Sequence, residues 1–140
     1  MNKKILFIIG GVIVIIALFL GFLHYNKPHV NVYEKKHDYA INIDDLFVEF
    51  QTNATLSIQK YSDKILLITG SLSTISKKNN DHTNIVVKGS RGIVNCELDS
   101  LYSQTIWNYQ KDDPVTLKGL FVGFDDLLGE IQLKKCIIIE

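Results

Sequence analysis

The chain has 140 residues, with 15 basic and 15 acidic side chains and therefore no formal net charge at pH 7. Lys3 and Lys4 precede an apolar run, so the 117 residues from His24 onward hold 13 of the basic residues and all 15 acidic ones. This slight acidic excess argues against a protein that binds polyanions by charge, because such proteins carry a marked basic excess. The length suits one small domain.

Residues 5–23 form an uncharged run of 19 residues that is rich in Val, Ile, Leu and Phe. A helix of this length spans about 28 Å, close to the ~30 Å hydrocarbon core of a bilayer. We predict a transmembrane helix over residues 5–23, within an uncleaved membrane anchor of residues 1–23. The alternative is a cleaved signal peptide, but its apolar region is usually about 7–15 residues long and precedes a small-residue cleavage site. Here the bulky Leu23-His24-Tyr25 follows instead.

Lys3 and Lys4 favour a cytoplasmic N-terminus, which predicts a single-pass protein of the bacterial cell membrane with its domain outside the cytoplasm. Residues 24–41 mix Lys, His, Pro and Asn without a sustained period, which predicts a tether. The domain itself is predicted over residues 42–140.

A helix is predicted over residues 43–61. Asn42 and the two acidic residues that follow Ile43 are typical of a helix start. A helical spacing then separates apolar side chains at Phe47, Phe50, Ala54, Ile58 and Tyr61. The alternative is a strand, since residues 48–58 also fit a period of two and contain poor helix formers such as Thr52 and Asn53.

Five strands follow. They are predicted at Lys64–Ile75, Asn84–Lys88, Ile93–Leu98, Val115–Phe124 and Glu130–Ile139. Gly70 inside the first strand predicts a bulge or sharp coil. Residues 89–92 predict a hairpin turn, and residues 99–110 a short helix or irregular cover that ends before Pro114. Five strands with this insertion between the third and fourth fit a small Greek-key barrel of the OB type, preceded by a helix.

Four segments carry a resemblance to a known family: Tyr61–Gly70, Val94–Leu98, Val115–Gly119 with Gly123, and Ile131–Ile138. With these segments the chain resembles the tRNA-anticodon-domain-like OB-fold family, small bacterial proteins that are often anchored or lipidated at the envelope. The resemblance covers about Asp44 to Ile139 and implies the helix-plus-barrel fold. Its motifs are framework glycines and apolar strand residues, so it implies little about the ligand, and it does not imply tRNA binding.

Catalytic and metal-binding patterns are missing from the sequence. None of His24, His29, His37 and His82 stands at a metal-ligand spacing from Cys, Asp or Glu. The pairs Asp112-Asp113 and Asp125-Asp126 are read as turn residues. We therefore predict no enzyme activity, no metal and no cofactor.

The two cysteines, Cys96 and Cys136, fall in the third and fifth predicted strands, which pair in an OB barrel. We predict that they lie on neighbouring strands and leave open whether they form a disulfide or remain two buried thiols. Because Lys134 shares its side of an ideal strand with Cys136, burial of Cys136 requires a bulge or an outward turn near Lys134-Lys135.

A candidate ligand face is predicted from the barrel strands and loops that OB proteins use for binding. Its members are basic or aromatic: Lys77, Lys78, Lys88, Arg91, Phe121 and Phe124.

The predicted function is a non-catalytic, membrane-anchored binding or interaction module outside the cytoplasm. Its partner is expected to be another envelope protein or a small ligand. The alternative is a binder of single-stranded nucleic acid or oligosaccharide on the barrel face. Nucleic acid is the less expected ligand, because the acidic residues Glu97, Asp99, Asp125 and Asp126 lie near the candidate face.

Overall fold

The computed structural model describes residues 12–21, 31–78 and 82–139 of the protein. The chain divides into two compact units, Met1–Val30 and Asn31–Glu140. In the first unit, residues 12–21 form a helix whose side chains are all exposed. Within the described residues, no helix combines the length and apolar character that crossing a membrane requires. The rest of the predicted span, residues 5–11 and 22–23, lies outside the described residues.

The second unit begins with a short turn and an edge strand. The backbone N–H of Lys35 donates to the carbonyl of Asn31, and Val32 is buried. Strand β1 (Tyr39–Asn42) then pairs in parallel with β2 (Ile65–Lys78). The prediction of a tether up to residue 41 is therefore wrong at its C-terminal end, because this polar stretch gains its strand structure by hydrogen bonding to β2.

Two helices follow β1 where one was predicted. α2 (Ile43–Thr52) starts at Asn42, whose side-chain oxygen accepts a hydrogen bond from the backbone N–H of Asp44 at 2.8 Å, as the predicted cap requires. The helix stops at Asn53, which is extended and in turn caps α3 (Ala54–Tyr61) through the backbone N–H of Leu56 at 3.0 Å. The prediction of one continuous helix over residues 43–61 is thus wrong at Asn53, and the alternative prediction of a strand is wrong throughout.

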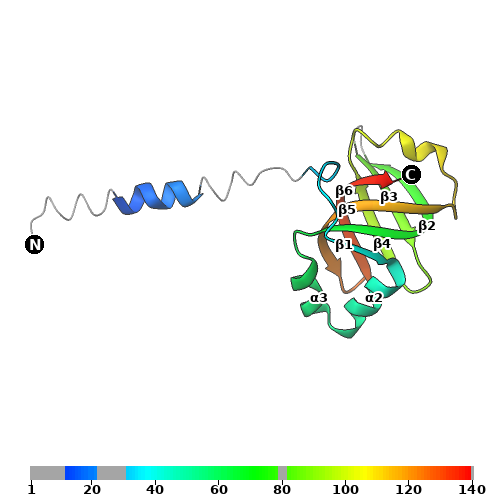
Figure 1. Ribbon diagram of the computed structural model, residues 1–140, viewed down its shortest axis with the longest axis horizontal. Helices are drawn as coiled ribbons and strands as arrows, with labels where there is room; N and C mark the ends of the chain where they lie inside the picture. Colours follow the sequence, from blue (N-terminus) through cyan, green and yellow to red (C-terminus); the bar gives the residue numbers. More distant parts are fainter. Residues whose placement is uncertain (1–11, 22–30, 79–81, 140) are drawn as a thin grey trace, which may run out of the picture. The chain divides into compact units, whose positions relative to one another are not determined.

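The strands β2, β3 (His82–Lys88), β4 (Ile93–Leu98), β5 (Pro114–Asp125) and β6 (Glu130–Ile139) form one closed barrel (Figure 1). The order is β1-β2-β3-β4-β6-β5, and β5 closes the barrel on β2. The third and fifth barrel strands, β4 and β6, pair in parallel, and all other barrel pairs are antiparallel. The predicted five-stranded barrel with a preceding helical segment is confirmed.

Gly70 lies where β2 changes partner. Residues 65–71 of β2 pair with β5, and the later residues pair with β3. A β-carbon on Gly70 would lie 2.5 Å from Cδ1 of Ile43 and 2.7 Å from Cγ1 of Val87. Glycine is therefore needed here because α2 and β3 both pack directly against the backbone.

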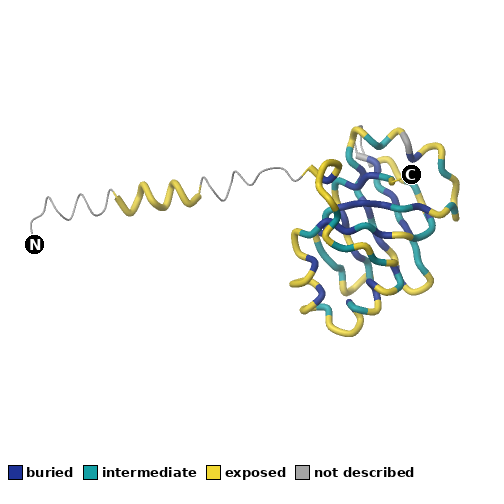
Figure 2. The backbone as a smooth tube through the Cα atoms, in the orientation of Figure 1, coloured by how far each residue is buried: buried dark blue, intermediate teal, exposed yellow. Residues whose placement is uncertain are grey.

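The barrel core is closed at its two ends by different segments (Figures 1 and 2). Phe50 of α2 stacks on Tyr61 and Phe121 at the helical end, with ring centroids 6.0 and 5.6 Å apart. At the other end, the segment between β4 and β5 contains the short 3-10 helix η1 (Thr105–Asn108), whose Ile106 is fully buried. Ile106 thus fills the barrel end, while its neighbour Trp107 is 57% exposed.

Candidate functional site

The predicted basic residues do not form one cluster. Lys77 is exposed and pairs with Thr83 at the start of β3, whereas Lys88 ends β3 and Arg91 lies in the following turn. Five residue steps along β3 separate the two groups by about 17 Å. The side chain of Lys78 lies outside the described part of the chain.

Acidic side chains lie beside the second basic group. Lys88 Nζ forms an ion pair with Oδ1 of Asp112 at 2.6 Å, and the hydrogen bond and charge of Lys88 lower the pKa of this carboxyl group. Oδ1 of Asp44 accepts a hydrogen bond from the backbone N–H of Arg91 at 2.8 Å. Negative charge next to Lys88 and Arg91 weakens the attraction that either residue offers a phosphate.

The predicted aromatic residues also lie away from a ligand surface. Phe121 is only 2% exposed and belongs to the core, so it cannot stack on a ligand at the barrel surface. Phe124 is half-buried and packs against Phe47 and Phe50, with ring centroids 6.4 and 4.8 Å apart. Both aromatic rings contribute to the contact between α2 and the barrel.

A polar groove lies instead on the outer face of β3, β4 and β6 and is also lined by Val122 of β5. It has a volume of about 280 Å³. Five of its seven lining residues carry amide or charged side chains, namely Asn84, Asn95, Glu97, Gln132 and Lys134, and the other two are Val122 and Leu133. We call this hollow the amide groove.

Strand register brings the groove residues together. Asn84 of β3 pairs with Glu97 of β4, and Asn95 of β4 pairs with Gln132 of β6. Val94, Cys96 and Leu98 are buried, so Asn95 and Glu97 project from the opposite face of β4. Three carboxamides and one carboxylate therefore meet across three adjacent strands, with Lys134 at the edge.

One groove atom has an unmet hydrogen-bonding capacity. Oδ1 of Asn84 is buried and accepts no hydrogen bond from any residue that the structure describes. The carbonyl oxygen of the same residue accepts one from Oγ of Ser76 at 3.3 Å. A buried acceptor without a donor is uncommon in folded proteins and costs roughly 1–3 kcal/mol. A ligand that donates a hydrogen bond here, after a rotation of the Asn84 side chain that exposes Oδ1, would remove this cost.

The sequence contained a signal for this groove. Apolar and polar residues alternate along Ile93–Leu98 and place Asn95 and Glu97 outward. The same alternation in β6 separates Gln132 and Lys134 from the buried Ile131 and Leu133. Sequence reasoning missed the groove because it weighed basic and aromatic side chains above neutral amides.

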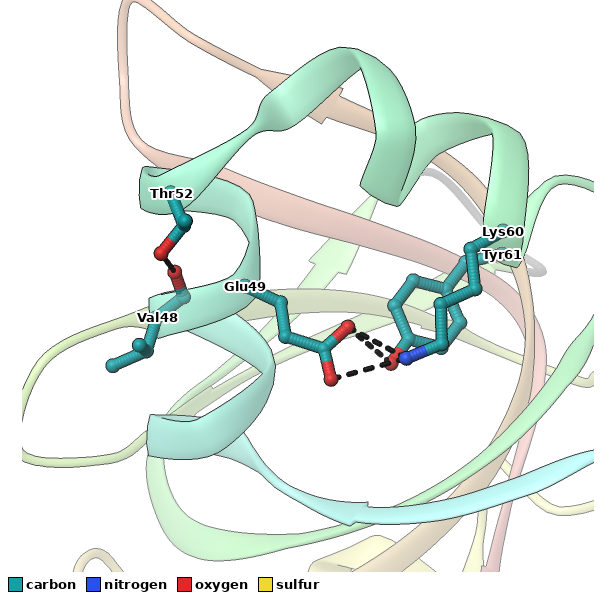
Figure 3. Close-up of polar contacts among 5 residues, drawn as sticks. All are labelled: Val48, Glu49, Thr52, Lys60 and Tyr61. Atoms are coloured by element: carbon teal, nitrogen blue, oxygen red, sulfur yellow. Dashed lines mark hydrogen bonds and ion pairs between the residues drawn. The ribbon is translucent and has the colours of Figure 1, made fainter.

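A second hollow lies between α2 and α3 and has a volume of about 250 Å³. Glu49 spans the helix break (Figure 3): its Oε2 atom lies 2.8 Å from both Lys60 Nζ and the Tyr61 hydroxyl. Burial raises the pKa of Glu49, but the hydrogen bonds from Lys60 and Tyr61 and the charge of Lys60 outweigh it and lower the pKa overall. These contacts fix the two helices to each other and explain the hollow as a packing feature.

The cysteines lie on neighbouring strands, as predicted, and both thiols are free and buried. Leu98 pairs with Cys136 and Cys96 pairs with Leu133, with a register shift between the two pairs. Lys135 has a φ of 51°, so the predicted bulge near Lys134-Lys135 is present and turns Cys136 inward. Burial, together with the hydrogen bond and charge of Cys96, raises the pKa of the Cys136 thiol. Among the described residues, no group of His, Cys, Asp and Glu could hold a metal ion.

The model of the tRNA_anti-like family matches residues 1–137. The chain belongs to the tRNA_anti-like family. This family is an OB-fold binding domain and is not catalytic itself. The chain's membership of this family confirms the resemblance inferred from the framework glycines and strand residues. No curated protein matches the sequence.

Solved structures share the fold of this family member. A proposed nucleic acid-binding lipoprotein from Klebsiella pneumoniae has a TM-score of 0.61 at 12% identity, covering 72% of this chain and 92% of that chain. A protein from Leishmania major assigned as an aspartyl-tRNA synthetase has a TM-score of 0.50 at 18% identity, covering 79% of this chain and 22% of that one. Asparaginyl-tRNA synthetase from Pyrococcus horikoshii has a TM-score of 0.45 at 16% identity, covering 58% of this chain and 20% of that chain. At these identities the first two matches show a common fold alone.

Proposed function

We propose that this protein is a membrane-tethered, non-catalytic binding module that holds an uncharged, hydrogen-bonding ligand in the amide groove. The single observation that carries the proposal is the buried Oδ1 of Asn84, which lacks a donor among the described residues. It lies in a groove whose other polar groups, Asn95, Gln132 and Glu97, also suit a ligand rich in hydroxyl or amide groups. An oligosaccharide has this chemistry, and OB barrels bind oligosaccharides and oligonucleotides on the face of their second and third strands, here β3 and β4.

The charge of the groove supports a neutral ligand. Glu97 and Lys134 contribute one charge of each sign. A phosphate-rich ligand would gain from Lys134 and be repelled by Glu97, whereas sugar hydroxyl groups can donate to carboxylate and amide oxygens alike. Net charge over the whole chain is zero, which agrees with this preference.

The proposed location is the bacterial cell membrane, with residues 5–23 as a single-pass helix and the barrel outside the cytoplasm. The support is the uncharged run of 19 residues behind Lys3 and Lys4 and the lack of a small-residue cleavage site. Intact-mass measurement of the mature protein, combined with carbonate washing of membranes, tests the anchor. A protein that starts at Met1 or Asn2 and stays with the membranes supports it, and a start near His24 contradicts it.

Single-stranded nucleic acid is the second candidate ligand. It is favoured by the Klebsiella pneumoniae structure, which is described as a nucleic acid-binding lipoprotein, and by the exposed Lys77 and Arg91. It is disfavoured by the separation of these residues along β3 and by the acidic partner of Lys88. We expect a dissociation constant no tighter than ~10⁻⁴ M at physiological salt, the weak end of non-specific binding.

Calorimetric titration tests the choice between these ligands. The probes are chitotetraose, a neutral oligosaccharide, and a decauridine oligonucleotide, each added to residues 31–140. This segment contains the complete barrel core. We expect binding of the saccharide that Asn84→Ala abolishes and the matched surface variant Asn108→Ala retains. Micromolar, steeply salt-dependent binding of the oligonucleotide would instead favour the second candidate.

A further inference from the structure

One end of the barrel exposes large apolar and aromatic side chains where the chain enters the domain. Leu101 is 85% exposed, Tyr33 62% and Trp107 57%. Tyr33 follows the first residues of the domain, and Leu101 and Trp107 belong to the segment between β4 and β5 (Figure 1). We call Tyr33, Leu101, Tyr102 and Trp107 the entry surface.

Specific contacts fix the entering segment to this end. The rings of Tyr33 and Tyr102 stack with their centroids 5.6 Å apart and an interplanar angle of 27°. Lys118 Nζ donates to the carbonyl oxygen of Tyr33 at 3.2 Å, and Val32 is only 3% exposed. The position at which the chain enters the domain is therefore set by the fold rather than by a loose linker.

The connection to the proposed membrane span is short. Eight residue steps separate Leu23, the last residue of the predicted span, from Asn31. Even a fully extended chain covers at most about 29 Å in eight steps. If residues 5–23 cross a bilayer, Asn31 is held within this distance of the membrane–water interface, and Tyr33, two residues further on, meets lipid at a high effective concentration.

The residue types of the entry surface suit that interface. Trp and Tyr concentrate at the headgroup level of membranes, because each ring has an apolar body and one polar group. Trp107 and Tyr33 provide such rings, and Leu101 adds an aliphatic side chain that can enter the acyl boundary. Exposed Lys35 and Lys36 lie close in sequence to Tyr33 and can contact anionic headgroups.

Three other strongly exposed apolar side chains, Leu56, Leu127 and Leu128, belong to different segments. Leu127 and Leu128 belong to the β5–β6 loop, where a β-carbon on Gly129 would lie 3.6 Å from Phe47 of α2, at the helical end of the barrel. The exposed Leu56 belongs to α3 itself. The segment that follows β4 and the loop that precedes β6 lie at opposite ends of this parallel strand pair, because Ile93 pairs with Glu130 and Leu98 pairs with Cys136.

We infer that the entry surface is a lipid-docking surface, which seats the barrel on the bilayer through Trp107, Leu101 and Tyr33. This inference rests on the proposed membrane tether. Docking would hold the domain in one orientation, with the helical end of the barrel and its β5–β6 loop turned away from the lipid.

Trp107 is the only tryptophan of the chain, so its fluorescence reports on this surface alone. The full chain is reconstituted in vesicles of phosphatidylcholine and phosphatidylglycerol, with plain or brominated acyl chains. Bromine quenches indole emission at short range. We expect brominated vesicles to cause about a twofold or greater loss of Trp107 emission, because the ring lies at the interface.

Two matched variants locate the effect. Leu101→Ser should reduce the quenching by bromine, whereas Leu127→Ser should leave it unchanged. Both leucines are surface residues, 85% and 97% exposed, so neither change is expected to disturb folding. Equal quenching in the two variants would contradict a role for Leu101 in docking.

The outcomes separate this inference from the tether. A chain that floats with vesicles but shows equal Trp107 emission in plain and brominated lipid would overturn the docking surface and leave the tether intact. A chain that does not float with vesicles would overturn both. Protection of Trp107 from dissolved acrylamide without quenching by bromine would show that protein covers the surface, which also overturns lipid docking.

Discussion

Asn84 of β3 lies opposite Glu97 of β4, so two polar side chains adjoin on the outer face of a barrel whose inner face is apolar. The neighbouring pair of Asn95 and Gln132 extends this polar strip across β6. Polar side chains are expected on the solvated face of a barrel sheet. The buried Oδ1 of Asn84, which lacks a donor among the described residues, is the feature of this strip that the proposed binding role has to explain.

Replacing Asn84 by leucine is expected to stabilise the domain while abolishing ligand binding. Removing an unmet buried acceptor and adding apolar contact should raise the free energy of unfolding by about 1 kcal/mol. Urea denaturation of residues 31–140 measures it. The control Asn108→Leu changes an exposed asparagine and should stay within about 0.5 kcal/mol of wild type. A clear loss of stability in Asn84→Leu would mean that Oδ1 has a structural partner.

Gly70→Ala is expected to lower the free energy of unfolding by about 1–3 kcal/mol, because the new methyl group overlaps Ile43 and Val87. Gly123→Ala is the matched control, since no atom lies within 4 Å of its added β-carbon. Both can be compared by urea denaturation. Equal effects at the two positions would show that β2 does not approach α2 and β3 as closely as described.

Glu49→Gln is expected to weaken the contact between α2 and α3 in a pH-dependent way. The folded protein lowers the pKa of Glu49 below its ordinary value of 4.5, so its stabilisation is present above pH 4.5. It is lost as the pH falls through the lowered pKa. The pair is partly exposed, with side chains 42% and 37% accessible, so we expect only about 0.5–1 kcal/mol at neutral pH.

Thermal denaturation of wild type and Glu49→Gln between neutral and strongly acidic pH measures this difference. Lys60→Met should reproduce most of the loss at neutral pH, and high salt should reduce it. A difference between wild type and Glu49→Gln that stays constant over the whole pH range would show that the charge of Glu49 does not contribute.

Cys96 and Cys136 are expected to react with Ellman's reagent only after unfolding. Both are fully buried, and burial raises the pKa of Cys136, so little thiolate is present or accessible in the folded protein. Denatured protein should titrate as two thiols without added reductant. If the thiols appear only after reduction, the two cysteines form a disulfide in the mature protein.

Much of the barrel follows from sequence patterns. Ile93–Leu98 and Glu130–Ile139 were predicted to the residue, because polar turns bound each run. The pairing of the third and fifth strands follows from the OB-barrel topology, and the bulge at Lys135 follows from the need to bury Cys136 next to the exposed Lys134. The strand bounds and the bulge depend on local sequence, since each depends on which side chains the core can accept.

Other features depend on tertiary contacts that no local pattern contains. The strand Tyr39–Asn42 forms only because the edge of β2 is available to it. Asn53 interrupts the helical pattern so that Glu49 can meet Lys60 and Tyr61 across the break. The amide groove combines residues from four strands, and its polar members become neighbours only through the register of β3, β4 and β6.

The most direct test of the amide groove as a binding site is to follow the side-chain amide resonances of Asn84, Asn95 and Gln132 during a ligand titration. They are recorded by NMR on residues 31–140 during titration with chitotetraose and, separately, decauridine. The account predicts saturable shifts of these three amides with the saccharide and none with the oligonucleotide. Saturable shifts with the oligonucleotide around Lys77, Lys88 and Arg91, without any at the groove amides, would contradict it.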